Sequence, residues 1–349
     1  MKILSILLFI LPLISSAQKP ELVIKTGVQG EAMISSVSPD SKLGLTVDNK
    51  MELMLWELGS GKQLKSFQNI LAADFGMDNK SIDVVTGDYK FRTIDYSGNI
   101  VSEGPVTKTS PSNKLTYSYY RKSGFYLENG FINTRDKGYL CRIVPPHFSE
   151  IQHYSETLNL LAIAYQGEVQ LCKVPTGEVA KVIKFNLVQQ SEILKEIKFI
   201  QFSPDGKYLL AGNNLSLEII EIESGQTVYT YSVPDKVKKE LLDNPNIRFL
   251  NTAGFSPDSK NLLILCAKHE LMVNLATKKE LWNKPQADIE CPVSYASRRG
   301  LIHFSDDGTK VLVGYYNKFQ FLNVENSNVI SKLVGITQAI WPIINCLKT

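Results

Sequence analysis

The chain has 349 residues, of which 44% are hydrophobic and 21% charged, and its formal net charge is only +3. This composition is typical of a globular protein and argues against a disordered chain. So small a net charge also argues against the dense basic surface with which proteins bind nucleic acids. We therefore expect a folded protein whose partner is not a nucleic acid.

Residues 1–17 have the features of a secretory signal peptide. Lys2 gives a positive start, residues 3–14 are almost wholly apolar, and residues 15–17 are small. The apolar run is shorter than the roughly 20 residues of a membrane-spanning helix, and no later stretch is long and apolar enough to span. We expect the signal to be removed, residues 18–349 to form one domain, and the mature protein to be periplasmic or secreted with no stable membrane span.

A short pattern recurs along the chain. Its clearest copy begins at Phe202, reads Phe-Ser-Pro-Asp-Gly, and is followed by an apolar segment at 208–212. Pro fixes φ, and Asp and Gly accept turn conformations, so each copy predicts a hairpin of two strands. Similar copies begin at Val37, Phe255 and Phe304, and degenerate ones surround Asp78, Asn113 and Ser155.

Each hairpin is followed by a third strand, a turn and a fourth strand. The order is clearest in residues 53–58, 59–62 and 63–67, and similar third strands occur at 169–174, 217–222 and 319–324. The anchors of the units recur every 35–53 residues, which is near the length of one blade of a β-propeller. These anchors are Asp40, Asp78, Asn113, Ser155, Asp205, Asp258 and Asp307.

These repeats resemble the WD-repeat family, from about residue 21 to residue 334. The resemblance implies an all-β fold, a β-propeller of about seven four-stranded blades held together by apolar packing. Leu55-Trp56-Glu57 stands where the family has its Trp-Asp pair, and residues 26–29 lack the Gly-His that begins a regular unit. We therefore carry the family's buried network of Asp, His, Ser or Thr and Trp over to no residue here.

The sequence does not decide which strand closes the ring. Propellers usually complete one blade with strands from both chain ends, which removes an exposed edge. Residues 21–25 are a candidate N-terminal closing strand. If they supply the outer strand of the last blade, residues 329–334 or 340–344 are left over, so eight blades remain an alternative to seven.

Three connections in the second half are long, at 186–196, 234–246 and 284–300. Each joins the fourth strand of one unit to the first strand of the next, so all three should emerge on the same face. Asp235 is a suitable cap for a short helix over 235–243, inserted between blades five and six. This insertion either packs over the blades or forms a ridge on which a partner docks, and apolar residues exposed in the other two connections would form a sticky face. The candidate binding residues are Lys236, Lys239, Leu241, Leu242, Ile193, Leu194 and Tyr295.

The sequence carries no recognisable catalytic signature. The four histidines lack metal-ligand spacing, and neither a Gly-x-Ser-x-Gly elbow nor a phosphate-binding Gly-rich loop occurs. Cys172 and Cys266 lie in apolar strand-like runs, where cysteine usually behaves as a small buried hydrophobe. We therefore expect no catalytic residue, no metal and no cofactor.

The expected function is that of an exported interaction module that binds another extracytoplasmic protein or a peptide without catalysis. The alternative is a propeller hydrolase or lyase acting on a carbohydrate or a lactone at the central channel. Convergence of His147, His153 or His269 with Asp or Glu at the channel mouth would favour this alternative.

Overall fold

The computed structural model describes residues 32–88, 90–106, 117–120, 125–128, 131–134, 138–142, 151–155, 157–165, 167–174, 176–188, 197–235, 250–266, 269–285, 300–315 and 318–334. These residues form seven four-stranded antiparallel sheets, each made of four strands that are consecutive in the chain. We number them sheet 1 to sheet 7 in chain order. In this part of the chain, no helix is long and apolar enough to cross a membrane.

The strands have the following bounds. Sheets 1 to 3 contain β1 (Ala32–Val37), β2 (Leu43–Asp48), β3 (Leu53–Glu57) and β4 (Lys62–Phe67); β5 (Ile70–Phe75), β6 (Ser81–Thr86), β7 (Lys90–Asp95) and β8 (Ile100–Val106); β9 (Tyr117–Tyr120), β10 (Phe125–Glu128), β11 (Phe131–Thr134) and β12 (Gly138–Arg142). Sheets 4 and 5 contain β13 (Gln152–Ser155), β14 (Leu160–Tyr165), β15 (Glu168–Lys173) and β16 (Val179–Lys184); β17 (Phe199–Phe202), β18 (Tyr208–Gly212), β19 (Ser216–Glu221) and β20 (Thr227–Ser232). Sheets 6 and 7 contain β21 (Leu250–Phe255), β22 (Asn261–Cys266), β23 (His269–Asn274) and β24 (Lys279–Pro285); β25 (Gly300–Phe304), β26 (Lys310–Tyr315), β27 (Lys318–Asn323) and β28 (Val329–Val334).

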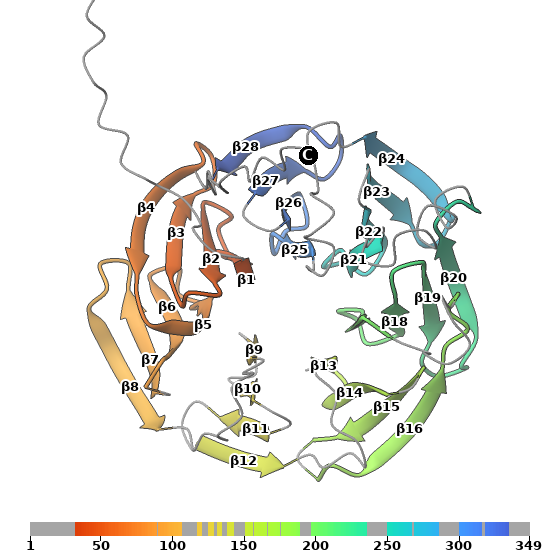
Figure 1. The fold of residues 1–349 in the computed structure, drawn as a ribbon, viewed down its shortest axis with the longest axis horizontal. Helices are drawn as coiled ribbons and strands as arrows, with labels where there is room; N and C mark the ends of the chain where they lie inside the picture. The colour runs from red at the N-terminus through yellow and green to blue at the C-terminus, as the bar shows by residue number, and fades with distance from the viewer. Residues whose placement is uncertain are drawn as a thin grey trace, which may run out of the picture.

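The sheets stand side by side around a ring (Figure 1). The first strand of each sheet lies nearest the centre and the fourth on the circumference, and inner strands of neighbouring sheets contact each other, as β1 does with β5 and β25. Burial follows this order: every residue of the second strand β6 is buried, whereas every residue of the fourth strand β4 is at least partly exposed. The described residues therefore have an all-β, propeller-like fold, as the repeats predict.

Apolar side chains between neighbouring sheets form the core. Leu45 and Leu55 of sheet 1 share a buried cluster with Phe75 of sheet 2. Equivalent clusters join sheets 4 and 5, sheets 5 and 6, and sheets 6 and 7. Each large side chain buried in this way contributes on the order of 1.5–3 kcal/mol. The apolar packing between blades that the resemblance implies is present at each of these interfaces.

The Ser-Pro-Asp-Gly segments form the turns between first and second strands. The Ser203 hydroxyl donates to Asp205 at 2.6 Å, and the backbone N–H groups of Lys207 and Tyr208 donate to Asp205 and Ser203. Gly206 follows with a φ of 74°. In sheet 6 the same left-handed position holds Ser259, with a φ of 60°, and its hydroxyl accepts the N–H of Asp205 in the preceding sheet. The side chain at this position therefore ties two turns together.

Two expectations differ from the structure. Asn113 was expected in the turn before a second strand, but Tyr117–Tyr120 is the first strand of sheet 3 and pairs only with β10 among the described strands. The Ser-Pro pair at residues 110–111 resembles the repeated turn, so the sequence pattern assigns the strand that follows it to the second position of the sheet instead of the first. The buried Trp56 also donates its indole N–H to Thr46 at 2.9 Å, so a Trp–Thr pair of the family's kind is present in sheet 1.

Other expectations fall on residues that the structure does not describe. The short helix expected over 235–243 lies outside the described residues except for Asp235, and the candidate closing strand at 21–25 lies wholly outside them. Residues 329–334 are placed, as the fourth strand of sheet 7.

The interface between sheet 7 and sheet 1, which we call the seam, is held by side-chain packing. Val37, Met54, Trp56 and Leu58 share a buried cluster with residues of sheet 7 that include Phe319 and Phe321. The Ser331 hydroxyl of β28 donates to the carbonyl oxygen of Leu58, in the turn after the third strand of sheet 1.

The seam repeats a contact found at other interfaces. In each case a side chain of the fourth strand donates to a carbonyl in the turn that follows the third strand of the next sheet. The pairs are Lys65 with Ser97, Lys181 with Ile222, and Trp282 with Val324. The first and last sheets therefore meet in the same way as sheets that are neighbours in sequence.

Gly61 permits a close approach of the two sheets at the seam, which gives a test of this packing. Gly61 and Gly225 occupy equivalent turns with φ of 73° and 74°, so replacing either by alanine costs the same backbone strain, about 1–2 kcal/mol. A Cβ at Gly61 would lie 2.5 Å from the carbonyl oxygen of Lys332, whereas one at Gly225 meets nothing within 4 Å. We expect Gly61→Ala to destabilise the protein by about 1–3 kcal/mol more than Gly225→Ala.

Urea unfolding of both variants measures this difference in the free energy of unfolding, provided that the two transitions have the same m-value. Equal losses of stability in the two variants would contradict the close packing of the seam.

Candidate functional site

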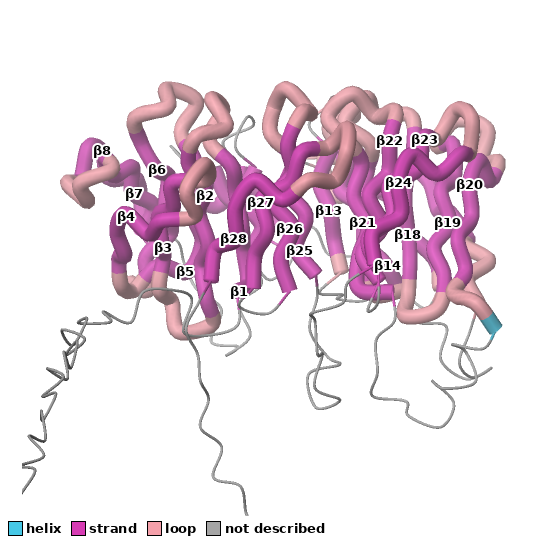
Figure 2. The backbone as a smooth tube through the Cα atoms, turned by 90° about the horizontal axis from the view of Figure 1, so that it is seen from above, coloured by secondary structure: helices cyan, strands magenta, loops and turns pink. Residues whose placement is uncertain are grey.

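The three long connections leave the ring on one face. They join β16 to β17, β20 to β21 and β24 to β25, so each runs from a fourth strand to the first strand of the next sheet. In a four-stranded antiparallel sheet, this exit lies at the same end as the turn between the second and third strands. We call this side the connection face, and the opposite side, which carries the Ser-Pro-Asp-Gly turns, the turn face. The short stretch coloured as helix just after β20 lies on the connection face in Figure 2.

The predicted binding residues themselves are not placed. Ile193, Leu194, Lys236, Lys239, Leu241, Leu242 and Tyr295 all lie outside the described residues. The structure does describe the bases from which two of these connections leave.

The turn between β18 and β19 holds the base of the first connection. The Asn213 side chain donates to the carbonyl oxygen of Val188 at 2.8 Å, and the Ser216 hydroxyl accepts the Val188 N–H at 2.8 Å. Glu218, only 3% exposed, accepts the N–H of Asn186 at 2.6 Å and the hydroxyl of Thr227. Hydrogen bonds donated to a carboxylate in a buried place are among the stronger ones in proteins.

Leu187 lies between these anchored residues. It belongs to the connection expected at 186–196, and it is buried in a cluster with Phe185 and Ile197. Sheet 5 binds the backbone on both sides of Leu187, so the side chain packs inward. This residue is therefore part of the core.

The same turn also holds both ends of the second connection. The Val233 N–H donates to the carbonyl oxygen of Leu215 at 2.9 Å, and the Leu250 N–H donates to that of Asn214 at 3.2 Å. The Asn213 side-chain oxygen in turn accepts the N–H groups of Leu215 and Ser216. Residues 213–216 thus fix the bases of two long connections relative to each other.

A second set of polar side chains lies on the inner strands, near the centre of the ring. The N–H of Phe202 donates to His153 Nδ1 at 3.3 Å, and the N–H of Phe255 donates to the side-chain oxygen of Gln201 at 3.2 Å. The Ser36 hydroxyl of sheet 1 also donates to the Asp74 carboxyl of sheet 2, which is a contact between two side chains. An inner strand has an unpaired edge, and His153 and Gln201 satisfy backbone N–H groups at that edge of the next sheet.

Sequence reasoning missed this inner set, although a signal was present. A polar residue stands two positions before the first residue of the turn in Gln201-Phe202-Ser203, His153-Tyr154-Ser155 and Asp74-Phe75-Gly76. Gly254 occupies the same position in sheet 6 and supplies no side chain.

The two described histidines that could support catalysis lie apart in the fold. His153 is on the inner strand of sheet 4, and its Nδ1 accepts a backbone N–H. His269 begins the third strand of sheet 6 and contacts the hydroxyl of Tyr231. The described part of the chain therefore does not bring these two rings together, and His147 lies outside it.

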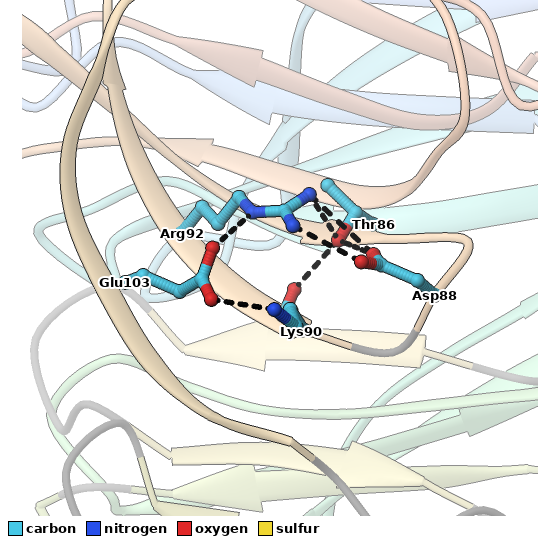
Figure 3. A network of polar contacts seen from close by, with 5 residues as sticks. All are labelled: Thr86, Asp88, Lys90, Arg92 and Glu103. Carbon is cyan, nitrogen blue, oxygen red and sulfur yellow. Dashed lines mark hydrogen bonds and ion pairs between the residues drawn. The ribbon is translucent and has the colours of Figure 1, made fainter.

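A charged network links β7 and β8 on the circumference of sheet 2 (Figure 3). Glu103 accepts from Arg92 at 2.8 Å and from Lys90 at 2.7 Å, and Arg92 also pairs with Asp88 at 3.0 Å. The hydrogen bonds from Lys90 and Arg92 lower the pKa of the Glu103 carboxyl. Two cations face two carboxylates, and pairs this exposed contribute little to stability. The network therefore offers no excess charge to a ligand.

His153 gives the inner set a pH-dependent test. Burial lowers the pKa of His153 to about 4, from 6.5, so the unfolded chain binds the proton more readily between these values. The free energy of unfolding should therefore fall as the pH drops from about 6.5 to about 4, by at most about 3 kcal/mol from this group. Gln201 shows that glutamine can accept the same kind of N–H, so His153→Gln should remove this part of the pH dependence.

Urea unfolding of the two proteins across this pH range measures the difference. Parallel curves for wild type and His153→Gln would show that His153 does not couple protonation to folding.

Comparison with protein-family models matches residues 152–242 to the WD40 domain of anaphase-promoting complex subunit 4. No curated protein matches the chain. The match covers sheets 4 and 5 completely, and so includes the turn at 213–216. The repeated turns, the ring of four-stranded sheets and this match over residues 152–242 together support a WD-repeat-like architecture.

Proposed function

We propose that this protein is an exported interaction module that binds another extracytoplasmic protein or a peptide through its connection face, without catalysis. The signal-like residues 1–17 support export to the periplasm or beyond. The WD-repeat-like fold supports a role as a protein-interaction scaffold.

One observation carries the choice of face. The turn at residues 213–216 fixes the bases of two long connections, and the third leaves from the next sheet on the same side. Binding costs less conformational entropy when the contacting loops start from a fixed base. Loops on a rigid scaffold are also where propellers and other β-proteins most often carry recognition.

The name of the matched family gives further support. That domain belongs to a subunit of a complex, so its name is one of association with other proteins. We transfer only the general expectation of protein binding to the present chain.

We also propose that the seven described sheets are the complete ring of blades. The seam between sheets 7 and 1 supports this count because its contacts repeat those of other interfaces. An eighth sheet would have to separate β1 from β25, which are in contact.

Affinity capture tests the proposed face. The bait is the mature protein, residues 18–349, exposed to envelope and secreted fractions of its own cells. We expect one partner to be captured by the wild type and lost when residues 235–243 are replaced by a short Gly-Ser loop. Asn213→Ala, which removes the side chain that binds Val188, should weaken binding of the purified partner at least tenfold.

Lys207→Ala and Lys260→Ala are the matched controls, because both exposed lysines lie on the turn face. They should bind the partner as the wild type does. Equal capture by all variants would place the binding site elsewhere. Turnover of a glycan or lactone by the purified protein, with no partner captured, would support the enzyme alternative.

A further inference from the structure

Three side chains with metal-binding atoms meet between sheets 5 and 6. The hydroxyl of Tyr231, on β20, lies 3.1 Å from Nε2 of His269 and 3.5 Å from Sγ of Cys266. The three residues come from the end of β20, the end of β22 and the start of β23. They therefore gather at the connection face, although strand β21 separates Tyr231 from the other two residues in the sequence.

The backbone holds Cys266 and His269 in a suitable arrangement. They flank the two-residue turn that joins β22 to β23, next to the paired residues Leu265 and Glu270. Residues that face each other across such a hairpin project to the same side of the sheet, with Cβ atoms about 4.5–5.5 Å apart. The side chains of Cys266 and His269 point toward sheet 5, because the Tyr231 hydroxyl of that sheet contacts both of them.

The spacing of the donor atoms also suits a small cation. Zn²⁺ binds cysteine sulfur at about 2.3 Å and histidine nitrogen at about 2.0–2.1 Å, so tetrahedral donors lie roughly 3.3–3.8 Å apart. The Tyr231 hydroxyl lies 3.5 Å from Sγ of Cys266, within this range, and 3.1 Å from Nε2 of His269, slightly below it. Cys266 is buried, whereas Tyr231 and His269 are partly exposed, so a cation can reach the cluster from solvent.

We propose that Cys266, His269 and Tyr231 bind one Zn²⁺ ion, with water as the fourth ligand. Sulfur and imidazole ligands favour Zn²⁺ over Mg²⁺ or Ca²⁺, which prefer oxygen. This site differs from the expectation that the protein binds no metal. Among the described residues no three of His, Cys, Asp and Glu converge, so the third protein ligand here is a tyrosine from another sheet.

Titration of the reduced mature protein with Co²⁺, a spectroscopic substitute for Zn²⁺, tests the site. We expect the charge-transfer absorption of a cysteine–Co²⁺ bond at a stoichiometry of one ion per chain, and its displacement by Zn²⁺. Cys266→Ala should abolish the absorption. His269→Gln and Tyr231→Phe, which preserve side-chain size better, should weaken Co²⁺ binding at least tenfold and at least threefold, respectively.

Cys172→Ala is the matched control, because Cys172 is also a free and buried cysteine in the described part of the chain. It should leave the absorption unchanged. Circular dichroism and urea unfolding without metal show which variants are folded, and conclusions are drawn from those alone. Wild-type protein without the absorption, or the same absorption in folded His269→Gln and Tyr231→Phe, would overturn the proposal.

Discussion

The fold depends on one constraint, which sheet 1 shows clearly: a sheet with two apolar faces needs a neighbouring sheet on each side to cover both. Leu45 and Leu55 of sheet 1 are covered by sheet 2, and Met54 and Trp56 of the same sheet are covered by sheet 7. A row of such sheets would leave one apolar face bare at each end, whereas the contact between sheets 7 and 1 covers both of these end faces. The seam is therefore as necessary to the hydrophobic core as any other interface, although no peptide bond of the described chain crosses it.

Polar groups make this apolar packing specific. Fourth-strand side chains such as Lys65 and Ser331 bind carbonyl groups of the next sheet on the circumference, while His153 and Gln201 bind N–H groups of the next sheet near the centre. Each contact fixes how far one sheet is displaced along its neighbour, which apolar contacts alone do not. The bases of two connections on the connection face are fixed in a similar way, because residues 213–216 hold them through hydrogen bonds.

Much of the fold could be predicted because its turns are chemically distinctive. Ser203 and Asp205 stabilise their own hairpin locally, so the pattern in the sequence reports the structure directly. The bond from Phe202 to His153 spans 49 residues, and no local rule predicts such a partner. The same holds for the hydroxyl of Tyr231, which meets Cys266 across 35 residues. The predicted binding residues on the long connections stay predictions, since they lie outside the described residues.

The seam has a consequence for the order of the sheets along the chain. Sheet 7 meets sheet 1 through the same kinds of contact as sheets that are neighbours in sequence. The contacts between sheets therefore do not distinguish the pair formed by the first and last sheets from the other pairs. A gene rearranged so that sheet 1 follows sheet 7, with the new ends in another connection, would encode the same set of interfaces. Evolution by duplication and shuffling of single blades is thus compatible with this ring, since each blade carries half of two interchangeable interfaces.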